Sequence, residues 1–471
     1  MVATDKANRS QPTTVIRFLS VLGPGLVTGA ADDDPSGIGT YSQAGAQLGF
    51  GIGWTMLLTY PLMAAIQEIS ARIGRTTGGG IAGNLRRHYP NWLLQTIVLL
   101  LFLANTINIG ADLSGMADAT RLLFGGPAFL YVFAFGSICI LGIVFVQYSR
   151  YVMVLKWLTL SLFAYVAALF ATHVPWIEAI SGVLLPRVSW NGAFLTTLVA
   201  ILGTTISPYL FFWQASQEAK DVKAEIQRNP LIRAPWQALS AFTRIRADTL
   251  AGMAFSNIIA LSIIITTAAT LNKAGIRQIA TSAEAAQALK PIAGEFAFVV
   301  FALGIVGTGL LAIPVLAGSA AYAIGEAWKW PIGLSREPRD AAAFYSTLAV
   351  AGVLGMALSL SPIDPIKALY WTAVLNGIIA VPVMVVMMLM AREKRVMGKF
   401  VVGGWLRWLG WASTTAMAVC VIGMLSAYRM PTAAGADSCC VIKIAAPRIQ
   451  SARWAHWSGR PVEKSRSRFS M

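Results

Sequence analysis

The chain has 471 residues, of which 56% are hydrophobic and 12% are charged. Because a soluble domain carries roughly 25% charged residues, this composition excludes an ordinary soluble protein and indicates a polytopic membrane protein. The formal net charge of +16 would suit a nucleic-acid-binding protein, but the basic residues lie in short segments between apolar runs, as in proteins whose loops set the membrane topology. We therefore expect a lipid bilayer around the protein and no nucleic acid partner.

Eleven mostly apolar stretches follow one another along the chain, each near the length of about 20 residues that a helix needs to cross a bilayer. We therefore expect an all-α polytopic membrane protein with about eleven transmembrane helices. Polar residues and proline interrupt the first and sixth stretches. The predicted spans lie near 18–48, 52–71, 92–117, 128–147, 153–172, 193–216, 249–271, 294–322, 343–361, 368–391 and 405–427.

Polar segments lie before and after these spans. Residues 1–17 contain no apolar region with a cleavage site, so we do not expect a signal peptide there. Residues 429–471 are polar, basic from Lys443 onward, and without the periodicity of a helix or a strand. We expect this tail to be disordered or only loosely attached to the membrane domain 18–428.

The distribution of Lys and Arg predicts the orientation in the membrane. With the N-terminus inside, the cytoplasmic segments are rich in basic residues, with clusters at 72–87, 220–246 and 392–407. The opposite loops carry few, namely Arg121, Arg187, Lys273, Arg277, Lys290 and Lys367. Since basic residues gather on the cytoplasmic side, we expect a cytoplasmic N-terminus and, with eleven spans, an external C-terminus. The expected location is a bacterial inner (cell) membrane.

The first span contains the sequence Asp32-Asp33-Asp34-Pro35-Ser36-Gly37. Carboxylates at membrane depth are costly and almost always face a partner, a cavity or an ion path. A break at Pro and Gly frees backbone carbonyls, which is tolerated at that depth where the irregular piece lines a cavity. Because carboxylate and carbonyl oxygens are ligands of hard cations, the stretch predicts a broken helix that binds a metal ion. Asp34 is the main candidate ligand, whereas Asp33 either holds a metal-bound water or caps the following half-helix.

The sixth span is interrupted by Pro208, which follows the small and hydroxyl residues of 203–207. Alone, such a proline would only kink a helix. Together with the break at Pro35, five spans earlier, it indicates an inverted-repeat transporter whose site lies near the bilayer midplane. We expect one repeat over about 18–172, a second over about 193–391, and an extra helix at about 405–427.

Two sequence motifs resemble those of a known family. Gly23-Pro24-Gly25 followed by Asp34-Pro35-Ser36-Gly37 resembles the first helix of the natural resistance-associated macrophage protein (Nramp) family, whose motif there is Asp-Pro-Gly-Asn. Residues 203–209, Gly-Thr-Thr-Ile-Ser-Pro-Tyr, resemble the family's sixth-helix motif Gly-Ala-Thr-Ile-Met-Pro-His. The resemblance implies a divalent-metal transporter with a leucine-transporter-type fold, a five-plus-five inverted repeat with helices 1 and 6 broken.

The resemblance also implies site residues. The metal-binding Asp of the family corresponds to Asp34, its metal-binding Asn to Gly37, its metal-binding Met to Ser207, and its carbonyl ligand to Thr204. With Asp33, which the acidic run itself suggests, the predicted metal site contains Asp34, Ser207, Thr204, Gly37 and Asp33. The residues expected around it or along the permeation path are Tyr209 and Gln214, at the positions of two family histidines, and Asn105, Asn108 and Asp112.

The departures from the family motifs bear on the transported ion. Ser207 offers a hydroxyl where the family has a thioether, and oxygen-only shells suit Mg²⁺, Ca²⁺ or Mn²⁺. Gly37 removes a side chain, so we expect a roomier cavity, which favours Mg²⁺ because that ion keeps several waters. The site chemistry looks closest to the Nramp-related magnesium transporter branch, although Mn²⁺ accepts the same shell. No cofactor is expected besides this transported ion, Mg²⁺ or Mn²⁺.

Proton coupling is a separate question. The family keeps an Asp and a Glu on the third helix as a proton path, and the best match here puts Asn105 and Asn108 at those positions. Amides cannot release a proton, although Asp112, Glu68 or Glu218 could substitute. We therefore expect weak or absent proton coupling.

Two other kinds of carrier stay open. One is a typical proton-coupled Mn²⁺/Fe²⁺ transporter of the same family. The other is a sodium-coupled carrier of an organic solute on the same fold, although three adjacent aspartates argue against an anionic substrate. A membrane enzyme is not expected, because no His or Cys pair lies within a span at a suitable spacing. The oligomeric state stays open.

Overall fold

The computed structural model describes residues 28–429 except Ala30, 146–161, 225–227 and 335. Every regular element in this part of the chain is helical. The predicted segment 1–17 lies outside the described residues, as do the beginning of the first predicted span and all of the predicted tail 429–471 except Arg429, which ends α20. The expectation of an all-α protein is confirmed.

The helices of the first half are α3 (Pro35–Leu48), η1 (Gly49–Ile52), α4 (Trp54–Thr77), α5 (Ile81–His88), α6 (Asn91–Phe124), α7 (Ala128–Phe145), α9 (Phe163–Ala171), α10 (Trp176–Leu184), α11 (Gly192–Thr205) and α12 (Pro208–Ala224). Those of the second half are η3 (Pro235–Gln237), α13 (Ala238–Thr267), η4 (Ala268–Asn272), α14 (Ser282–Ala286), η5 (Gln287–Leu289), α15 (Lys290–Ala293), η6 (Gly294–Phe296), α16 (Ala297–Trp328), α17 (Ala342–Ser359), α18 (Pro365–Arg392), α19 (Lys394–Met397) and α20 (Gly404–Arg429).

Within the described residues, eight helical segments are long and apolar enough to cross a membrane, with α11 and α12 taken together as one of them. The pair formed by α3–η1 and α4 passes the same test only jointly, and its direction changes by 111° at Gly53. Each predicted span overlaps at least one of the observed helices. Some boundaries differ, since α13 already begins at Ala238, where the prediction had 249.

The outward faces of several helices are apolar, whereas many polar side chains are buried. On α7, for example, Phe133 and Leu141 are more than half exposed, and the buried polar residues include Asp34, Asn108 and Asp112. This arrangement is the reverse of a soluble protein and suits a lipid environment, in which polar and ionisable groups face the bundle interior.

Both predicted helix breaks are present. Asp34 caps α3, its Oδ1 accepting a hydrogen bond from the Gly37 amide at 2.7 Å, and Pro35 takes the first helical position, where its missing N–H is harmless. The sixth span divides where α11 ends at Thr205 and α12 begins at Pro208. Proline cannot donate the hydrogen bond that would continue α11, so the chain is non-helical between these two residues.

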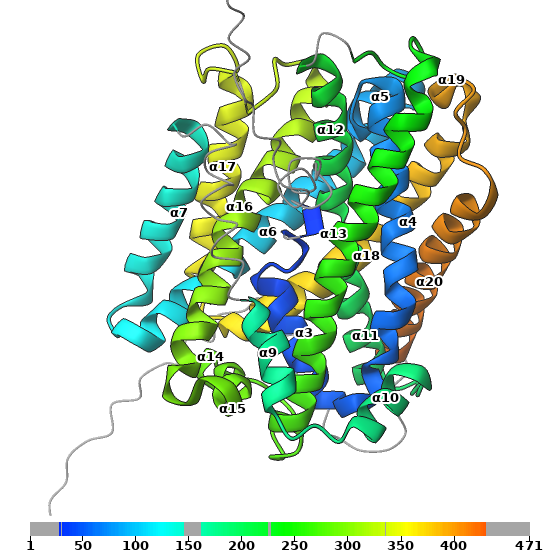
Figure 1. Ribbon diagram of the computed structural model, residues 1–471. Helices are drawn as coiled ribbons and strands as arrows, with labels where there is room; N and C mark the ends of the chain where they lie inside the picture. The colour runs from blue at the N-terminus through cyan, green and yellow to red at the C-terminus, as the bar shows by residue number, and fades with distance from the viewer. Residues whose placement is uncertain (1–27, 30, 146–161, 225–227, 335, 430–471) are drawn as a thin grey trace, which may run out of the picture. The chain divides into compact units, whose positions relative to one another are not determined.

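Helix α3 carries the first break into the interior of the bundle. It contacts α6, α11, α13 and α18, and Figure 1 shows it in dark blue among other helices. Small residues permit this close packing, because a Cβ at Gly39 or at Gly115 of α6 would lie 3.2 or 2.9 Å from the side chain of Leu369 on α18. The break at Asp34 is thus held within several helices.

Candidate metal-binding site

The carboxylate of Asp34 is the centre of the candidate site. Its Oδ1 accepts hydrogen bonds from the Ser36 hydroxyl at 2.6 Å and the Gly37 amide at 2.7 Å. Its Oδ2 accepts one from Asn108 Nδ2 on α6 at 3.0 Å and lies 3.4 Å from the Tyr209 hydroxyl on α12. The Asp34 carboxylate is therefore contacted from α3, α6 and α12, and Asp34 is only 1% exposed.

Tyr209 links the two breaks. Its hydroxyl donates to the backbone oxygen of Ala31 at 2.9 Å, so the residue after Pro208 bonds the chain just before Asp34. That Tyr209 lies around a bound ion stays a prediction.

Two polar residues of α6 lie beside Asp34. Asn108 donates through Nδ2 to Asp34, while its Oδ1 has no hydrogen-bond partner. Asp112, one turn farther, lies near the Asp34 carboxylate and the Ser36 amide, and neither of its oxygens is within hydrogen-bond geometry of a partner. Both side chains are fully buried.

Ser207 and Thr204 lie at the break between α11 and α12. The Ser207 hydroxyl is 2.8 Å from both the Gly203 and the Thr204 backbone oxygens, to which it donates. The hydroxyl proton of Ser207 is therefore engaged by backbone oxygens at the end of α11. The lone pairs of the Ser207 hydroxyl and of the Thr204 carbonyl oxygen can still coordinate a cation. Their role as metal ligands stays a prediction.

The surroundings of Gly37 contradict the expected roomier cavity. A Cβ at this position would lie 3.2 Å from the Asp32 carbonyl oxygen and from Thr204 Oγ1, and 3.4 Å from a ring carbon of Tyr41. The prediction was wrong because the threonine and tyrosine side chains occupy the room that the missing side chain leaves. Gly37 contributes its amide, which orients Asp34.

Asp32 and Asp33 face another helix. The hydroxyl of Ser256 on α13 lies 2.6 Å from Asp32 Oδ2 and 3.2 Å from Asp33 Oδ1. The chain approaches α13 closely here, since a Cβ at Gly29 would lie 2.2 Å from the Gly252 carbonyl oxygen. That Asp33 binds the ion stays a prediction, and Ser256, a hydroxyl within an apolar span, is a partner that sequence reasoning missed.

Two further residues predicted near the site have other partners. Asn105 donates to the Leu316 carbonyl oxygen at 2.8 Å and to the Ser319 hydroxyl at 2.7 Å, both on α16. Gln214 accepts a hydrogen bond from the Thr28 hydroxyl at 2.6 Å. Asn105 therefore joins α6 to α16, and Gln214 joins α12 to the segment before the first break.

The cluster around Asp34 contains four buried aspartates, Asp32, Asp33, Asp34 and Asp112. Among the residues that the structure describes, no Lys or Arg forms an ion pair with Asp32, Asp33, Asp34 or Asp112. In the same part of the chain, no three His, Cys, Asp or Glu residues converge in a metal-binding arrangement. A cation bound at Asp34 would therefore need amide, hydroxyl or carbonyl oxygens in addition to carboxylates.

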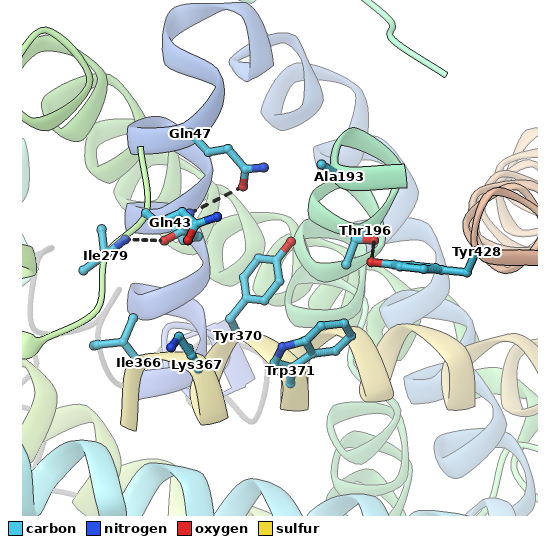
Figure 2. A pocket seen from close by; sticks show the side chains of 11 residues that line it. Gln43, Gln47, Ala193, Thr196, Ile279, Ile366, Lys367, Tyr370, Trp371 and Tyr428 are labelled. Carbon is cyan, nitrogen blue, oxygen red and sulfur yellow. Dashed lines mark hydrogen bonds between the residues drawn. The ribbon is translucent and has the colours of Figure 1, made fainter. Parts of the chain in front are cut away.

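A cavity of about 230 Å³ lies farther along α3. Figure 2 shows Gln43 and Gln47 of α3, Thr196 of α11 and Tyr370 of α18 around it. Amide and hydroxyl groups line it together with Lys367, which pairs with Asp364 at 2.6 Å. None of the residues that line this cavity belongs to the cluster around Asp34, and none of them is a carboxylate.

Comparisons with known proteins relate the whole membrane domain to one family. The profile described as "Natural resistance-associated macrophage protein-like" matches residues 25–427. Two similar relatives are both named divalent metal cation transporter MntH. The one from Chromohalobacter salexigens is 26% identical over 323 residues, which cover 65% of this chain and 72% of that protein. The one from Pectobacterium carotovorum is 24% identical over 405 residues, which cover 83% and 90%.

A crystal structure of the Eremococcus coleocola manganese transporter, in a histidine-to-alanine mutant, has a similar fold. The TM-score is 0.68 at 14% identity, and the match covers 90% of this chain and 91% of that one. At this identity the likeness shows the fold alone, and it confirms the predicted helical class.

Proposed function

Because this chain belongs to the Nramp family, whose profile matches residues 25–427, we propose that it transports divalent metal cations across a membrane. The observation that carries the proposal is the Asp34 carboxylate, which is 1% exposed at a helix break. Among the described residues it has no cationic partner, and charged groups within membranes otherwise mark ion paths. The names of the MntH relatives support the same substrate class.

The proposed transport mechanism is alternating access around a site near the midplane. Two broken helices bound the site, and rocking of one repeat against the other would expose it to each side in turn. The repeats are those expected at about 18–172 and 193–391, with an extra helix at about 405–427. The hydrogen bond between Tyr209 and Ala31 supports this, because it joins the two breaks beside Asp34.

The proposed substrates are hard cations, Mg²⁺ or Mn²⁺. The candidate ligands Asp34, Asp33, Ser207, Thr204 and Gly37 offer only oxygen atoms, which suit such ions. The sulfur ligand that would favour a softer metal is missing at position 207. Between these two ions we propose a preference for Mg²⁺, together with kinship to the Nramp-related magnesium transporter branch.

Weak or absent proton coupling is also proposed. Of the three carboxylates that could replace the family's proton path, Glu68 pairs with Arg72 and Glu218 with Arg244, each at 2.5 Å. Among the described residues, Asp112 forms no such pair. Uptake of a divalent cation down the membrane potential needs no proton, because roughly 2.3 kcal/mol per charge is available for each 100 mV. The proposed location is a bacterial inner membrane with a cytoplasmic N-terminus, the orientation that the basic residues predict.

The test is metal flux into proteoliposomes, with Mg²⁺, Mn²⁺ and Fe²⁺ offered separately and the internal pH recorded. We expect Mg²⁺ or Mn²⁺ entry without acidification, reduced at least tenfold in Asp34→Asn. The matched control is Asp364→Asn, which removes an exposed carboxylate paired with Lys367 and should transport as the wild type does.

The other results are equally informative. Fe²⁺ preference with acidification would contradict the hard-cation, uncoupled mechanism and favour a typical proton-coupled transporter. Absence of flux for every metal would contradict metal transport, and a sodium-coupled solute carrier would then be tested with the same vesicles.

A further inference from the structure

One face of α6 lies against the break that Asp34 caps. Asn108 and Asp112 are four residues apart, so they project from the same side of the helix. Asn108 reaches Asp34 Oδ2 at 3.0 Å, and Asp112 lies near both Asp34 and the Ser36 amide. One turn farther, Met116 and Pro35 both lie against Gly309. Residues of this face of α6 therefore lie along the chain from Asp34 to Ser36.

Two acceptor groups on this face are poorly satisfied: Asn108 Oδ1 has no hydrogen-bond partner, and the Asp112 carboxylate has only the Ser36 amide beside it. Both side chains are 0% exposed. Buried polar atoms are nearly always paired, and a buried carboxylate without a cationic partner is costly. One turn before, the buried amide of Asn105 is hydrogen-bonded, because its Nδ2 donates to the Leu316 carbonyl oxygen and the Ser319 hydroxyl.

The other groups around the Asp34 carboxylate leave less room and fewer free acceptor atoms for an ion. Ser36 and the Gly37 amide already occupy Oδ1. The Ser207 hydroxyl donates to its own helix end, and the space beside Gly37 contains Thr204 Oγ1 and the Tyr41 ring. Asp32 Oδ1 and Asp33 Oδ2 also lack a partner, but these two side chains lie against Ser256 of α13. The unpaired acceptor whose side chain bonds Oδ2 itself is that of Asn108 on α6.

We propose that the transported ion is bound on the α6 side of the break, where the amide oxygen of Asn108 and the carboxylate of Asp112 join Oδ2 of Asp34. This inference rests on the proposed function, because it names ligands of the transported ion. The Asn108 side-chain amide has a donor, Nδ2, and an acceptor, Oδ1, and a rotation of the amide group by about 180° exchanges their positions. Its nitrogen holds Asp34 without the ion, and its oxygen faces the ion when the ion is bound.

This ligand set also selects the charge of the substrate. Two carboxylates, Asp34 and Asp112, neutralise a divalent cation but leave a net negative charge around a monovalent one. In a buried site the uncompensated charge is costly, so divalent ions bind in preference to Na⁺ or K⁺. All three ligand atoms are oxygens, which again favours hard ions.

Thiol substitution tests direct ligation. A cysteine at a position that touches the ion supplies a soft ligand and raises the affinity for Cd²⁺ relative to Mn²⁺. We would measure both affinities by calorimetry on the purified full chain for the wild type, Asn108→Cys, Ser207→Cys and Asn105→Cys. The wild type shows how much Cd²⁺ the four native cysteines bind. Asn105→Cys is the matched control, one turn away on the same helix.

We expect Asn108→Cys to raise the Cd²⁺/Mn²⁺ preference at least tenfold and Asn105→Cys to change it less than twofold. A preference within twofold of the wild type for Asn108→Cys would overturn the inference. A shift at Ser207→Cys without one at Asn108→Cys would also overturn it, because the ion would then lie against α12.

A second pair of variants decides the matter if the cysteine variant does not fold. Asn108→Asp keeps an oxygen ligand and should bind Mn²⁺ at least as tightly as the wild type, whereas Asn108→Leu should lose at least tenfold. Equal Mn²⁺ affinities for these two variants would overturn the inference. Failure of the proposed function gives a different result, in which the wild type and Asp34→Asn both lack metal binding and flux.

Discussion

Replacement of Gly37 by asparagine restores the residue of the family motif, and the surroundings predict that it will not fit. The new Cβ would lie 3.2 Å from the Asp32 carbonyl oxygen and from Thr204 Oγ1, and 3.4 Å from Tyr41. Overpacking of a well-packed interior costs about 1–3 kcal/mol. At about 2 °C per kcal/mol for a large domain, the melting temperature should fall by about 2–6 °C.

Thr204 is the neighbour that can be removed, because the family motif has alanine at this position. We expect Thr204→Ala to recover part of the loss in the double variant, with a coupling of about 1 kcal/mol in the double-mutant cycle. The measurement is the melting temperature of the purified protein in detergent. Gly403→Asn is the matched control, since a Cβ there meets nothing within 4 Å.

Two results would refute this reasoning. A melting temperature for Gly37→Asn equal to that of Gly403→Asn would mean that the site accommodates the side chain. Strict additivity of Gly37→Asn and Thr204→Ala would mean that the Thr204 hydroxyl does not occupy the space beside Gly37.

Two ion pairs and one helix cap give further predictions, all checked by melting temperature. Arg244→Ala leaves Glu218 with its 0% exposed side chain without its ion-pair partner, so we expect a loss of about 3–5 kcal/mol. The exposed pair of Lys367 and Asp364 should matter little, and Lys367→Ala should cost less than about 1 kcal/mol; equal effects of the two variants would contradict this contrast. Glu326 accepts the Gly80 and Gly83 amides at the start of α5 at 3.0 and 2.9 Å. Glu326→Gln should therefore cost about 1–2 kcal/mol, and an unchanged melting temperature would argue against this cap.

The sequence by itself determined the class of protein and the positions of both helix breaks. Apolar stretches long enough to cross a bilayer are local features, so each predicted span overlaps a helix. The breaks at Pro35 and Pro208 are local as well, because proline lacks the amide hydrogen that a helix interior needs. Asp34 could be singled out for the same reason, since it is a carboxylate beside such a break.

Only the tertiary structure decided which groups face Asp34. Asn108 is distant in sequence, and its approach to Asp34 depends on the rotation of α6 about its axis and on its packing against α3. Asn105, three residues earlier, points instead to α16. The contents of the space beside Gly37 were equally beyond prediction, because they depend on how Thr204 and Tyr41 pack. Local sequence sets where a helix begins and ends, whereas contacts between helices follow from packing over the whole bundle.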